Sequence, residues 1–376
     1  MAKMMGGRAT VEGTRRYTQR FTGRLAAEHF RELEGGAGAW LSTLGLGTYL
    51  GPEDGVTDVL YQDAVLRSLA LGVNVIDTAV NYRHQRSERA IRTALATAIS
   101  LGVITRDQVV VATKGGFIPF DGAVPRDPRA YYAATYVETG IIKPGDVAKG
   151  AHCMTPRYLR DQIDRSRANL GLETLDVYLV HNPETQLGEV DRAELLVRMR
   201  AAFGALEEAV AAGSIARYGT ATWTGYRVEP SDPGYLSLPE LVAMAREVGG
   251  ADHHFKVIQL PYNLGMTEAF TRATQSVKNR MVPALEAARE LGVSVMASAA
   301  LHQGQLVRLP PVMAEYIPGL TTDAQRAVQF VRSTPGVGTA LVGMKTPAHV
   351  DENATVGALA PMAWKQFQRL FSAAAG

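Results

Sequence analysis

The sequence contains a single cysteine, Cys153, among its 376 residues. One thiol cannot form a disulfide within the chain, so nothing favours a secreted domain held together by disulfides. No apolar run reaches the roughly 18 residues that indicate a membrane-spanning helix. Residues 1–21 carry positive charge but lack the apolar segment of a secretory signal. We therefore expect a cytoplasmic protein with no membrane partner.

Net charge is also nearly absent. The 39 Lys and Arg residues almost balance the 37 Asp and Glu residues, which leaves a formal net charge of +2. A balanced chain gives no reason to expect nucleic acid or an anionic surface as a partner. The sequence alone does not indicate an oligomeric state.

Compact metal-binding motifs are missing as well. The sequence has neither H-x-H nor H-E-x-x-H, although it contains His152, His253, His254 and His302. His253 and His254 stand just before a predicted strand, at the opposite end from the strand termini where chemistry is expected. A metal-dependent hydrolase is therefore disfavoured, and we predict no metal site.

Short apolar runs rich in Val, Ile and Thr are plentiful, and segments with helical periodicity alternate with them. Hydrophobic residues make up 46% of the chain, enough for a large core. The runs are continuous rather than alternating, which is typical of parallel strands buried on both faces. The eight predicted strands span residues 41–49, 73–79, 108–115, 175–182, 216–223, 255–262, 293–300 and 339–344.

Glycine marks the ends of several predicted helices. Gly72 does so in "LGVNV", and the pattern recurs in "LGLETLDV", "AAGSIARYG" and "LGVSVMA". Eight strand–helix units predict an α/β fold, a (β/α)₈ TIM barrel. The rival is a doubly wound open sheet, which usually has fewer strands and a Gly-rich first turn; the chain has no G-x-G-x-x-G after an early strand.

Two segments depart from this rhythm. Residues 1–38 are polar and weakly patterned, and we interpret them as an N-terminal extension that covers the barrel bottom or mediates association; the barrel domain then spans 39–376. Residues 117–153 form a long insertion after the third strand, far beyond the usual length of such a loop. Its position places it at the active-site face.

Four polar residues stand where predicted strands end or just beyond. Asp77 ends the second strand and Tyr82 follows it, Lys114 ends the third and His181 ends the fourth. In a barrel these ends share one rim. A lysine ammonium beside a phenol favours its ionised form, Asp77 supplies the lysine's counter-charge, and a histidine beside the phenol orients a carbonyl. Such a proton donor needs a hydride source, which implies a nicotinamide cofactor.

Taken singly, each of the four has an ordinary structural role, as a turn cap, a solvated lysine, a core histidine or a packing tyrosine. Taken together, the motifs of the chain resemble those of the aldo-keto reductase superfamily over about residues 43–360. The motifs that carry the resemblance are "LGLGTY", "VIDTAVNY", "SERAIRTAL", "VVVATKGG", "LDVYLVHNP", "IQLPYN", "LHQGQL" and "LVGMKTPAHVDEN". The resemblance implies that Tyr82 is the general acid–base, that Lys114 and Asp77 adjust its pKa, and that His181 is the fourth member of this catalytic tetrad.

The resemblance also implies NADP(H) or NAD(H) as the cofactor, bound in extended form. We expect NADP(H) to be preferred and NAD(H) to be possible. Thr222 and Gln259 are expected near the carboxamide, the stretch from Gly343 to Asn353 at the adenosine end, and Lys345 and His349 at a 2′-phosphate. The cofactor-binding residues implied are Thr222, Gln259, Gly343, Lys345, His349, Glu352 and Asn353.

The expected reaction is reduction of an aldehyde or ketone, or oxidation of the corresponding alcohol or sugar. The sequence departs from the family at Ala221, where a polar residue is usual, and at Ser298, where an aromatic residue often stacks on the nicotinamide. These departures and the insertion keep an alternative open, a nicotinamide-binding redox sensor with little turnover.

The substrate pocket is expected to involve the insertion. The C-terminal "MAWKQFQRLFSAAAG" predicts a short closing helix rather than a long tail over the active site. We predict that the insertion replaces such a tail, with Phe117, Phe120, Tyr131 and Tyr132 lining the pocket. The alternative is that these aromatic side chains anchor the insertion to the barrel.

Overall fold

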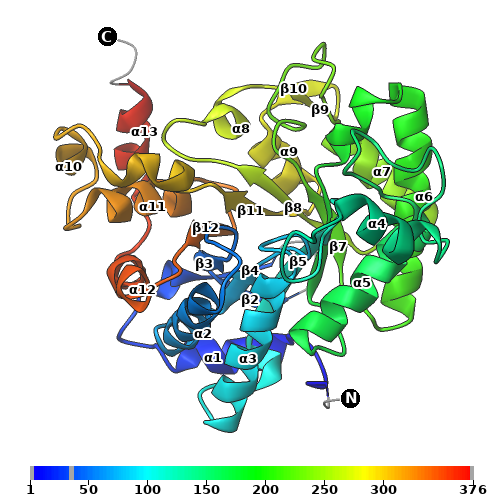
Figure 1. The fold of residues 1–376 in the computed structure, drawn as a ribbon. Helices are drawn as coiled ribbons and strands as arrows, with labels where there is room; N and C mark the ends of the chain where they lie inside the picture. The colour runs from blue at the N-terminus through cyan, green and yellow to red at the C-terminus, as the bar shows by residue number, and fades with distance from the viewer. Residues whose placement is uncertain (1–3, 34–37, 373–376) are drawn as a thin grey trace.

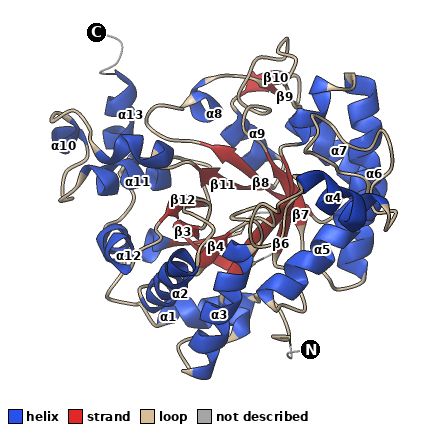
Figure 2. Ribbon diagram, viewed as in Figure 1, coloured by secondary structure: helices blue, strands red, loops and turns tan. Residues whose placement is uncertain are grey.

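The computed structural model describes residues 4–33 and 38–372. Eight parallel strands close into a barrel, and helices surround it (Figures 1 and 2). This confirms the predicted (β/α)₈ barrel. In chain order, the barrel strands are β3 (Leu44–Gly47), β4 (Val75–Asp77), β5 (Val110–Gly115), β6 (Val177–His181), β7 (Tyr218–Ala221), β8 (Phe255–Pro261), β11 (Ser294–Ser298) and β12 (Thr339–Gly343).

Each predicted strand contains one barrel strand, but the first prediction, 41–49, was too long at its start. Its first residues belong to β2 (Trp40–Ser42), which pairs antiparallel with β1 (Phe30–Glu32) outside the barrel. The chain bends at Thr43, and Ser42 Oγ donates across the bend to the Leu44 carbonyl at 2.6 Å. The Ser42 amide donates to Asn74 Oδ1 at 2.8 Å, which fixes the hairpin to the start of β4.

The helices lie outside the barrel. The four glycines predicted to end helices all have positive φ: Gly72 at 93°, Gly171 at 64°, Gly213 at 73° and Gly292 at 67°. Only glycine adopts this conformation without a steric cost, so the predicted stops are confirmed. The α-helices are α1 (Val11–Gln19), α2 (Gly55–Ala70), α3 (Arg86–Ser100), α4 (Pro128–Tyr132), α5 (Pro156–Leu170), α6 (Arg192–Ala211), α7 (Leu238–Gly249), α8 (Glu268–Thr271), α9 (Ala284–Glu290), α10 (Met313–Tyr316), α11 (Asp323–Ser333), α12 (Pro347–Ala354) and α13 (Trp364–Ser372).

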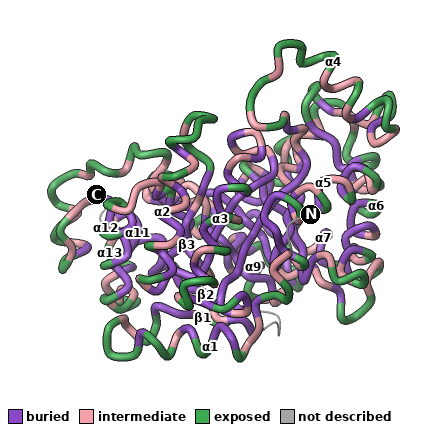
Figure 3. Tube along the Cα trace, turned by 60° about the horizontal axis from the view of Figure 1, so that its bottom comes forward, coloured by how far each residue is buried: buried purple, intermediate pink, exposed green. Residues whose placement is uncertain are grey.

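The barrel has two main core clusters; Figure 3 colours the backbone of the buried residues purple. One fills the space between the barrel and its helices. The other fills the barrel interior with side chains that include Val110, Leu179 and Met296. Leu33 and Leu41 from the N-terminal region join this inner cluster, so the interior is packed rather than open.

The N-terminal segment closes the end of the barrel where the strands begin. Tyr17, Phe21 and Phe30 are buried in the outer core. The Ala9 amide donates to Asp176 Oδ1 at 2.7 Å, just before β6. Of the two roles that the sequence left open for this segment, the structure shows the covering of the barrel bottom.

The 117–153 insertion has a small core of its own, made by Tyr136, Ile142 and Cys153 with Tyr158 of α5. It leaves and rejoins the barrel at one place, where the Cys153 amide donates to the Gly116 carbonyl at 2.8 Å. Its helix α4 stands out from the barrel in Figure 3. A second excursion, β9 (Gln275–Val277) and β10 (Arg280–Val282), forms a hairpin. Within the described residues, no helix is long and apolar enough to span a bilayer.

Candidate active site

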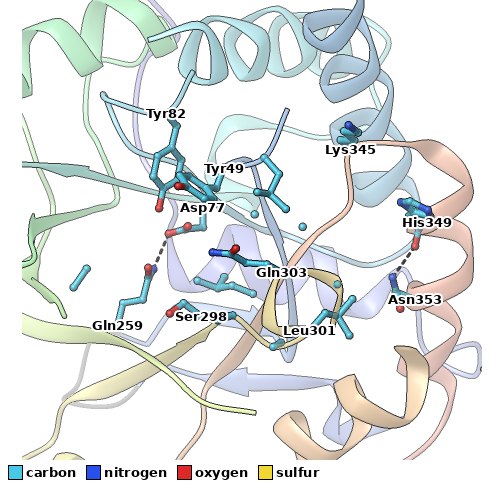
Figure 4. A pocket seen from close by; sticks show the side chains of 18 of the residues that line it. Tyr49, Asp77, Tyr82, Gln259, Ser298, Leu301, Gln303, Lys345, His349 and Asn353 are labelled. Atoms are coloured by element: carbon cyan, nitrogen blue, oxygen red, sulfur yellow. Dashed lines mark hydrogen bonds between the residues drawn. The ribbon is translucent and has the colours of Figure 1, made fainter. Parts of the chain in front are cut away.

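A cavity of about 870 Å³ opens at the carboxyl ends of the barrel strands. Asp77, His181, Ala221, Ser298 and Gly343 each end a strand and line it. Figure 4 shows its length: Tyr82, Asp77 and Gln259 lie at one end, and Lys345, His349 and Asn353 at the other. The polar residues that the sequence placed on one rim are therefore brought together.

The end of the cavity that holds Tyr82, Asp77 and Gln259 is called the catalytic end of the candidate site. Lys114 contacts Asp77 and Tyr82 there and is completely buried. Its Nζ donates to Asp77 Oδ1 and Oδ2, both at 2.8 Å, and to the Thr78 carbonyl at 2.8 Å. The fourth contact of Nζ is the Tyr82 hydroxyl, at 3.1 Å. Asp77 Oδ1 also accepts from Gln259 Nε2 at 2.7 Å. The register explains the pair: Ala112 lies opposite Asp77, and Lys114 is two residues further along the same face.

Protonation of Tyr82 reflects two opposed influences. Burial raises the pKa of the Tyr82 phenol, and the Lys114 ammonium opposes that rise without cancelling it. The effect expected of Lys114, to lower the pKa of Tyr82, is present, but the loss of hydration on burial is larger and the net pKa is raised. The pKa of Lys114 is raised by Asp77 and Tyr82, against the effect of its burial. Tyr82 is thus a protonated donor beside a fixed cation.

His181 lies edge-on to Tyr82, with ring centroids 6.0 Å apart. Burial, the Lys114 charge and His152 lower the pKa of His181 well below its usual value, so the ring is neutral. The His181 carbonyl is held by His152 Nε2 at 2.6 Å. Gln186 Nε2 donates to His152 Nδ1 at 2.7 Å, which places the His152 proton on Nε2. The bond between His152 and the His181 carbonyl has no local sequence signal, because the two residues are 29 positions apart.

The predicted cofactor residues all line the same cavity: Thr222, Gln259, Gly343, Lys345, His349, Glu352 and Asn353. Glu352 Oε1 accepts from Thr322 Oγ1 at 2.6 Å. Asn353 Nδ2 donates to the His349 carbonyl at 3.0 Å, so α12 orients this end of the groove. Lys345 stands just before the amino end of α12, where backbone N–H groups favour an anion.

Unpartnered polar atoms support an extended polar ligand in this groove. Asn81 Oδ1, His181 Nδ1, Thr222 Oγ1 and Asn353 Oδ1 are buried and lack a hydrogen-bond partner among the described residues. All four belong to residues that line the cavity. Buried polar atoms are normally satisfied, so four unpartnered atoms on residues of one cavity are consistent with a polar ligand in it.

The insertion contributes to the cavity differently from the prediction. Phe117 lines it and packs against the His181 ring, with centroids 5.0 Å apart. The structure places the other three aromatic residues away from its wall. Phe120 contacts Tyr131 at 5.6 Å between centroids, and Tyr131 and Tyr132 contact Tyr136 at 6.3 and 6.0 Å. They anchor the insertion because it needs apolar contacts of its own to be ordered.

Several cavity residues were missed by sequence reasoning. Tyr49 packs against Tyr82, with centroids 5.0 Å apart, and Trp223 is 43% exposed at the mouth. Asn81 and Asn182 each adjoin a predicted catalytic residue, and that adjacency was the available signal. The segment after β11 adds Leu301 and Gln303. Among the residues described, no group of three His, Cys, Asp or Glu side chains is arranged to hold a metal ion.

Acidification is expected to destabilise the fold through two buried histidines. Burial lowers the pKa values of His29 and His152 to about 4. The unfolded chain takes up protons below about pH 6.5 while the folded chain does not, so stability is lost as pH falls towards 4. Each histidine should cost about 2 kcal/mol at pH 5. Urea unfolding at pH 7 and at pH 5 measures the loss of stability between the two pH values. His152→Gln should reduce that loss by the contribution of one histidine. An unchanged loss in this variant would contradict the prediction.

Comparisons with known proteins agree with this geometry. A family model described as "Aldo/keto reductase family" matches residues 43–309. The NADH-specific methylglyoxal reductase of Escherichia coli is 24% identical over 286 residues, which cover 74% of this chain and 69% of that protein. The holo form of aldo-keto reductase AKR11C1 from Bacillus halodurans superposes with a TM-score of 0.62 at 19% identity, covering 91% and 95% of the two chains. An aldo/keto reductase from Klebsiella pneumoniae, in complex with NADP and acetate, gives 0.58 at 20% identity with the same coverage.

Proposed function

Because the chain belongs to the aldo/keto reductase family, and is thus an NAD(P)-dependent oxidoreductase, we propose that it reduces aldehyde or ketone carbonyls with Tyr82 as general acid. In the reverse direction it oxidises the corresponding alcohols or sugars, with Tyr82 as the base. The observation that carries the proposal is the Lys114 ammonium, bound to Asp77 at 2.8 Å and to the Tyr82 hydroxyl at 3.1 Å.

The nicotinamide, when bound, supplies the hydride that the side chains cannot. The chain's residues then handle the proton. The Tyr82 hydroxyl donates its proton to the carbonyl oxygen, and the adjacent Lys114 charge stabilises the phenolate left behind. Asp77 holds Lys114 in place and balances its charge in the buried site. Neutral His181, whose Nδ1 is unpartnered among the described residues, is available to orient the carbonyl.

The test of this proposal is turnover. Methylglyoxal is a rational first substrate because a reductase of that compound is a relative, and glyceraldehyde is a second. Saturable oxidation of NADPH or NADH by either compound supports the reductase. Binding of the nicotinamide cofactor without turnover of any carbonyl compound in a panel would favour the redox-sensing alternative. The observation behind that alternative is Ser298, which stands at the end of β11 in place of an aromatic residue.

NADP(H) is the proposed preferred cofactor, and Lys345 is the residue expected to decide it. Lys345 and His349 line the adenosine end of the groove, beside the amino end of α12. Lys345→Ala should weaken NADPH binding about 10-fold, equivalent to about 1.4 kcal/mol, because one charge-assisted phosphate contact is lost. NADH, which lacks the 2′-phosphate, should bind as before. Fluorescence titration measures both; equal losses for the two cofactors would contradict the assignment.

Phe117 is the residue of the insertion expected to affect substrate binding. Its ring packs on His181 and forms part of the cavity wall. Phe117→Ala should raise KM for an apolar aldehyde about 10-fold through lost contact area, with a smaller effect on methylglyoxal. Tyr132→Ala is the matched control, since Tyr132 contacts Tyr136 within the insertion, and should leave the ratio of the two KM values unchanged. If the ratio of the two KM values changed in Tyr132→Ala but not in Phe117→Ala, Tyr132 and not Phe117 would be the residue that affects substrate binding.

A further inference from the structure

The backbone directly after Tyr82 is unusual. Arg83, His84 and Gln85 all have positive φ, at 48°, 50° and 71°. A side chain makes this region unfavourable, and glycine is the residue that normally occupies it. Three successive non-glycine residues persist there only where the surrounding structure holds them, and such strain clusters at functional sites. The contacts of this tripeptide therefore need an explanation.

Arg83 fastens the tripeptide to the region between β3 and α2. Its side chain is almost fully buried. Nε donates to the Pro52 carbonyl at 2.8 Å and Nη2 to the Asp54 carbonyl at 3.0 Å. Nη2 also forms an ion pair with Asp58 Oδ1 at 2.7 Å. These contacts hold one side of the Tyr82 loop against the amino end of α2.

His84 and Gln85 fasten the tripeptide to the insertion. The His84 carbonyl accepts from the Gly122 amide at 2.8 Å. The imidazole of His84 packs on the Phe120 ring, with centroids 5.4 Å apart. Gln85 Nε2 donates to the Phe120 carbonyl at 2.8 Å. His84 Nε2 also lies 3.7 Å from Glu53 Oε1, in the region that Arg83 contacts. The loop is therefore held both by the start of the insertion and by the segment between β3 and α2.

A buried side chain secures the tripeptide from behind. Asn169 of α5 donates through Nδ2 to Gln85 Oε1 at 3.0 Å and to Glu88 Oε2 at 2.9 Å. Glu88 is completely buried and also accepts from Thr113 Oγ1 at 2.7 Å, one residue before Lys114. The loop that carries Tyr82 and the strand that carries Lys114 are thus joined by one hydrogen-bond network.

We propose that residues 83–85 are a positioning element for Tyr82, and that the insertion acts on the reaction by clamping this element through Phe120 and Gly122. The inference rests on the proposed role of Tyr82 as the acid. The Tyr82 hydroxyl must stay near Lys114 Nζ, 3.1 Å away, while its own backbone lies in a loop. A rigid, strained tripeptide directly after it removes the freedom that would let the hydroxyl drift, and small misplacements of a reacting group are costly to rate.

The test uses variants that loosen the clamp without touching the cavity. His84→Gly removes the imidazole and relieves the backbone strain, so stability should change little. Phe120→Ala removes the insertion's ring, and Phe120→Tyr restores it. Lys278→Gly is the matched control, because Lys278 also has positive φ, 49°, in the β9–β10 turn. The readout is the single-turnover rate constant and amplitude of NADPH oxidation with saturating methylglyoxal, alongside Tm.

We expect His84→Gly and Phe120→Ala to lower the rate constant at least 10-fold with full amplitude and little change in NADPH affinity. Phe120→Tyr and Lys278→Gly should match the wild type. A lower amplitude with an unchanged rate constant would mean lost folded enzyme and would overturn the positioning role. Wild-type rate constants in both variants, with Tyr82→Phe inactive, would overturn it too. Activity of Tyr82→Phe would instead overturn the proposed function itself.

Discussion

Tyr82→Phe is expected to lower kcat for carbonyl reduction by about 10³-fold, the typical contribution of a positioned general acid. The substitution removes only the hydroxyl that contacts Lys114 Nζ at 3.1 Å. The ring remains packed between its neighbours, so Tm and the affinity for NADPH should stay close to wild type. Steady-state kinetics with methylglyoxal, together with fluorescence titration of NADPH, separates the chemical step from binding.

The control is Tyr235→Phe, which removes another buried hydroxyl, one that donates to the Thr274 carbonyl at 2.8 Å far from the cavity. This variant should lose about 1 kcal/mol of stability and keep its kcat. The pH profile is a further check. Burial keeps Tyr82 protonated and His181 neutral, so kcat for reduction should be flat between about pH 6 and pH 9. Turnover by Tyr82→Phe within tenfold of wild type would exclude Tyr82 as the acid.

Lys114→Met is expected to cost about 3–5 kcal/mol of stability as well as activity, because it leaves a buried carboxylate without its cation. Asp77 is only 5% exposed, and Gln259 Nε2 would remain as its side-chain donor. Adding Asp77→Asn should restore most of the stability by removing the unpaired charge, but no turnover, since Tyr82 still lacks its ammonium partner. Urea unfolding and kinetics on the two single variants and the double variant measure both effects.

The contrast for this pair is the surface ion pair between Arg160 and Glu208, whose side chains are 50% and 67% exposed. Arg160→Met should change stability by less than about 1 kcal/mol, since water screens exposed pairs. If Lys114→Met were equally mild, Asp77 would not depend on the lysine for its charge balance. If the double variant regained turnover, the ammonium would not be needed by Tyr82.

The barrel and the grouping of polar residues at its rim could be predicted because both leave local marks in the sequence. Strands buried on two faces appear as continuous apolar runs, and polar residues at their carboxyl ends, such as Asp77 and His181, interrupt those runs visibly. Glycines such as Gly72 mark the helix ends. The segment from Gly343 to Asn353 was expected to bind the cofactor for a different reason, the resemblance of "LVGMKTPAHVDEN" to the family, and its residues line the cavity.

The remaining features depend on contacts between distant segments, which leave no periodic signal. The aromatic residues of the insertion were expected in the pocket, but Tyr131 and Tyr132 pack on Tyr136 instead. Nothing in "YRHQ" indicates three left-handed residues, since non-glycine residues adopt that conformation only when tertiary contacts impose it. The net direction of the Tyr82 pKa depended on the depth of burial, which the sequence does not give.

The N-terminal segment that closes the barrel bottom also constrains when folding can finish. Arg31 of β1 donates through Nη2 to the Arg332 carbonyl at 2.6 Å, and the Ala26 amide donates to the Gly357 carbonyl at 2.9 Å. Strand β3 pairs with β12, which is synthesised last of the barrel strands. The segment around Ala26 and Arg31 and strand β3 therefore reach their final partners only after the late segments of the barrel have been made. Until β12 has been made, the emerging chain has an open sheet edge beside β3, which is exposed to pairing with other chains.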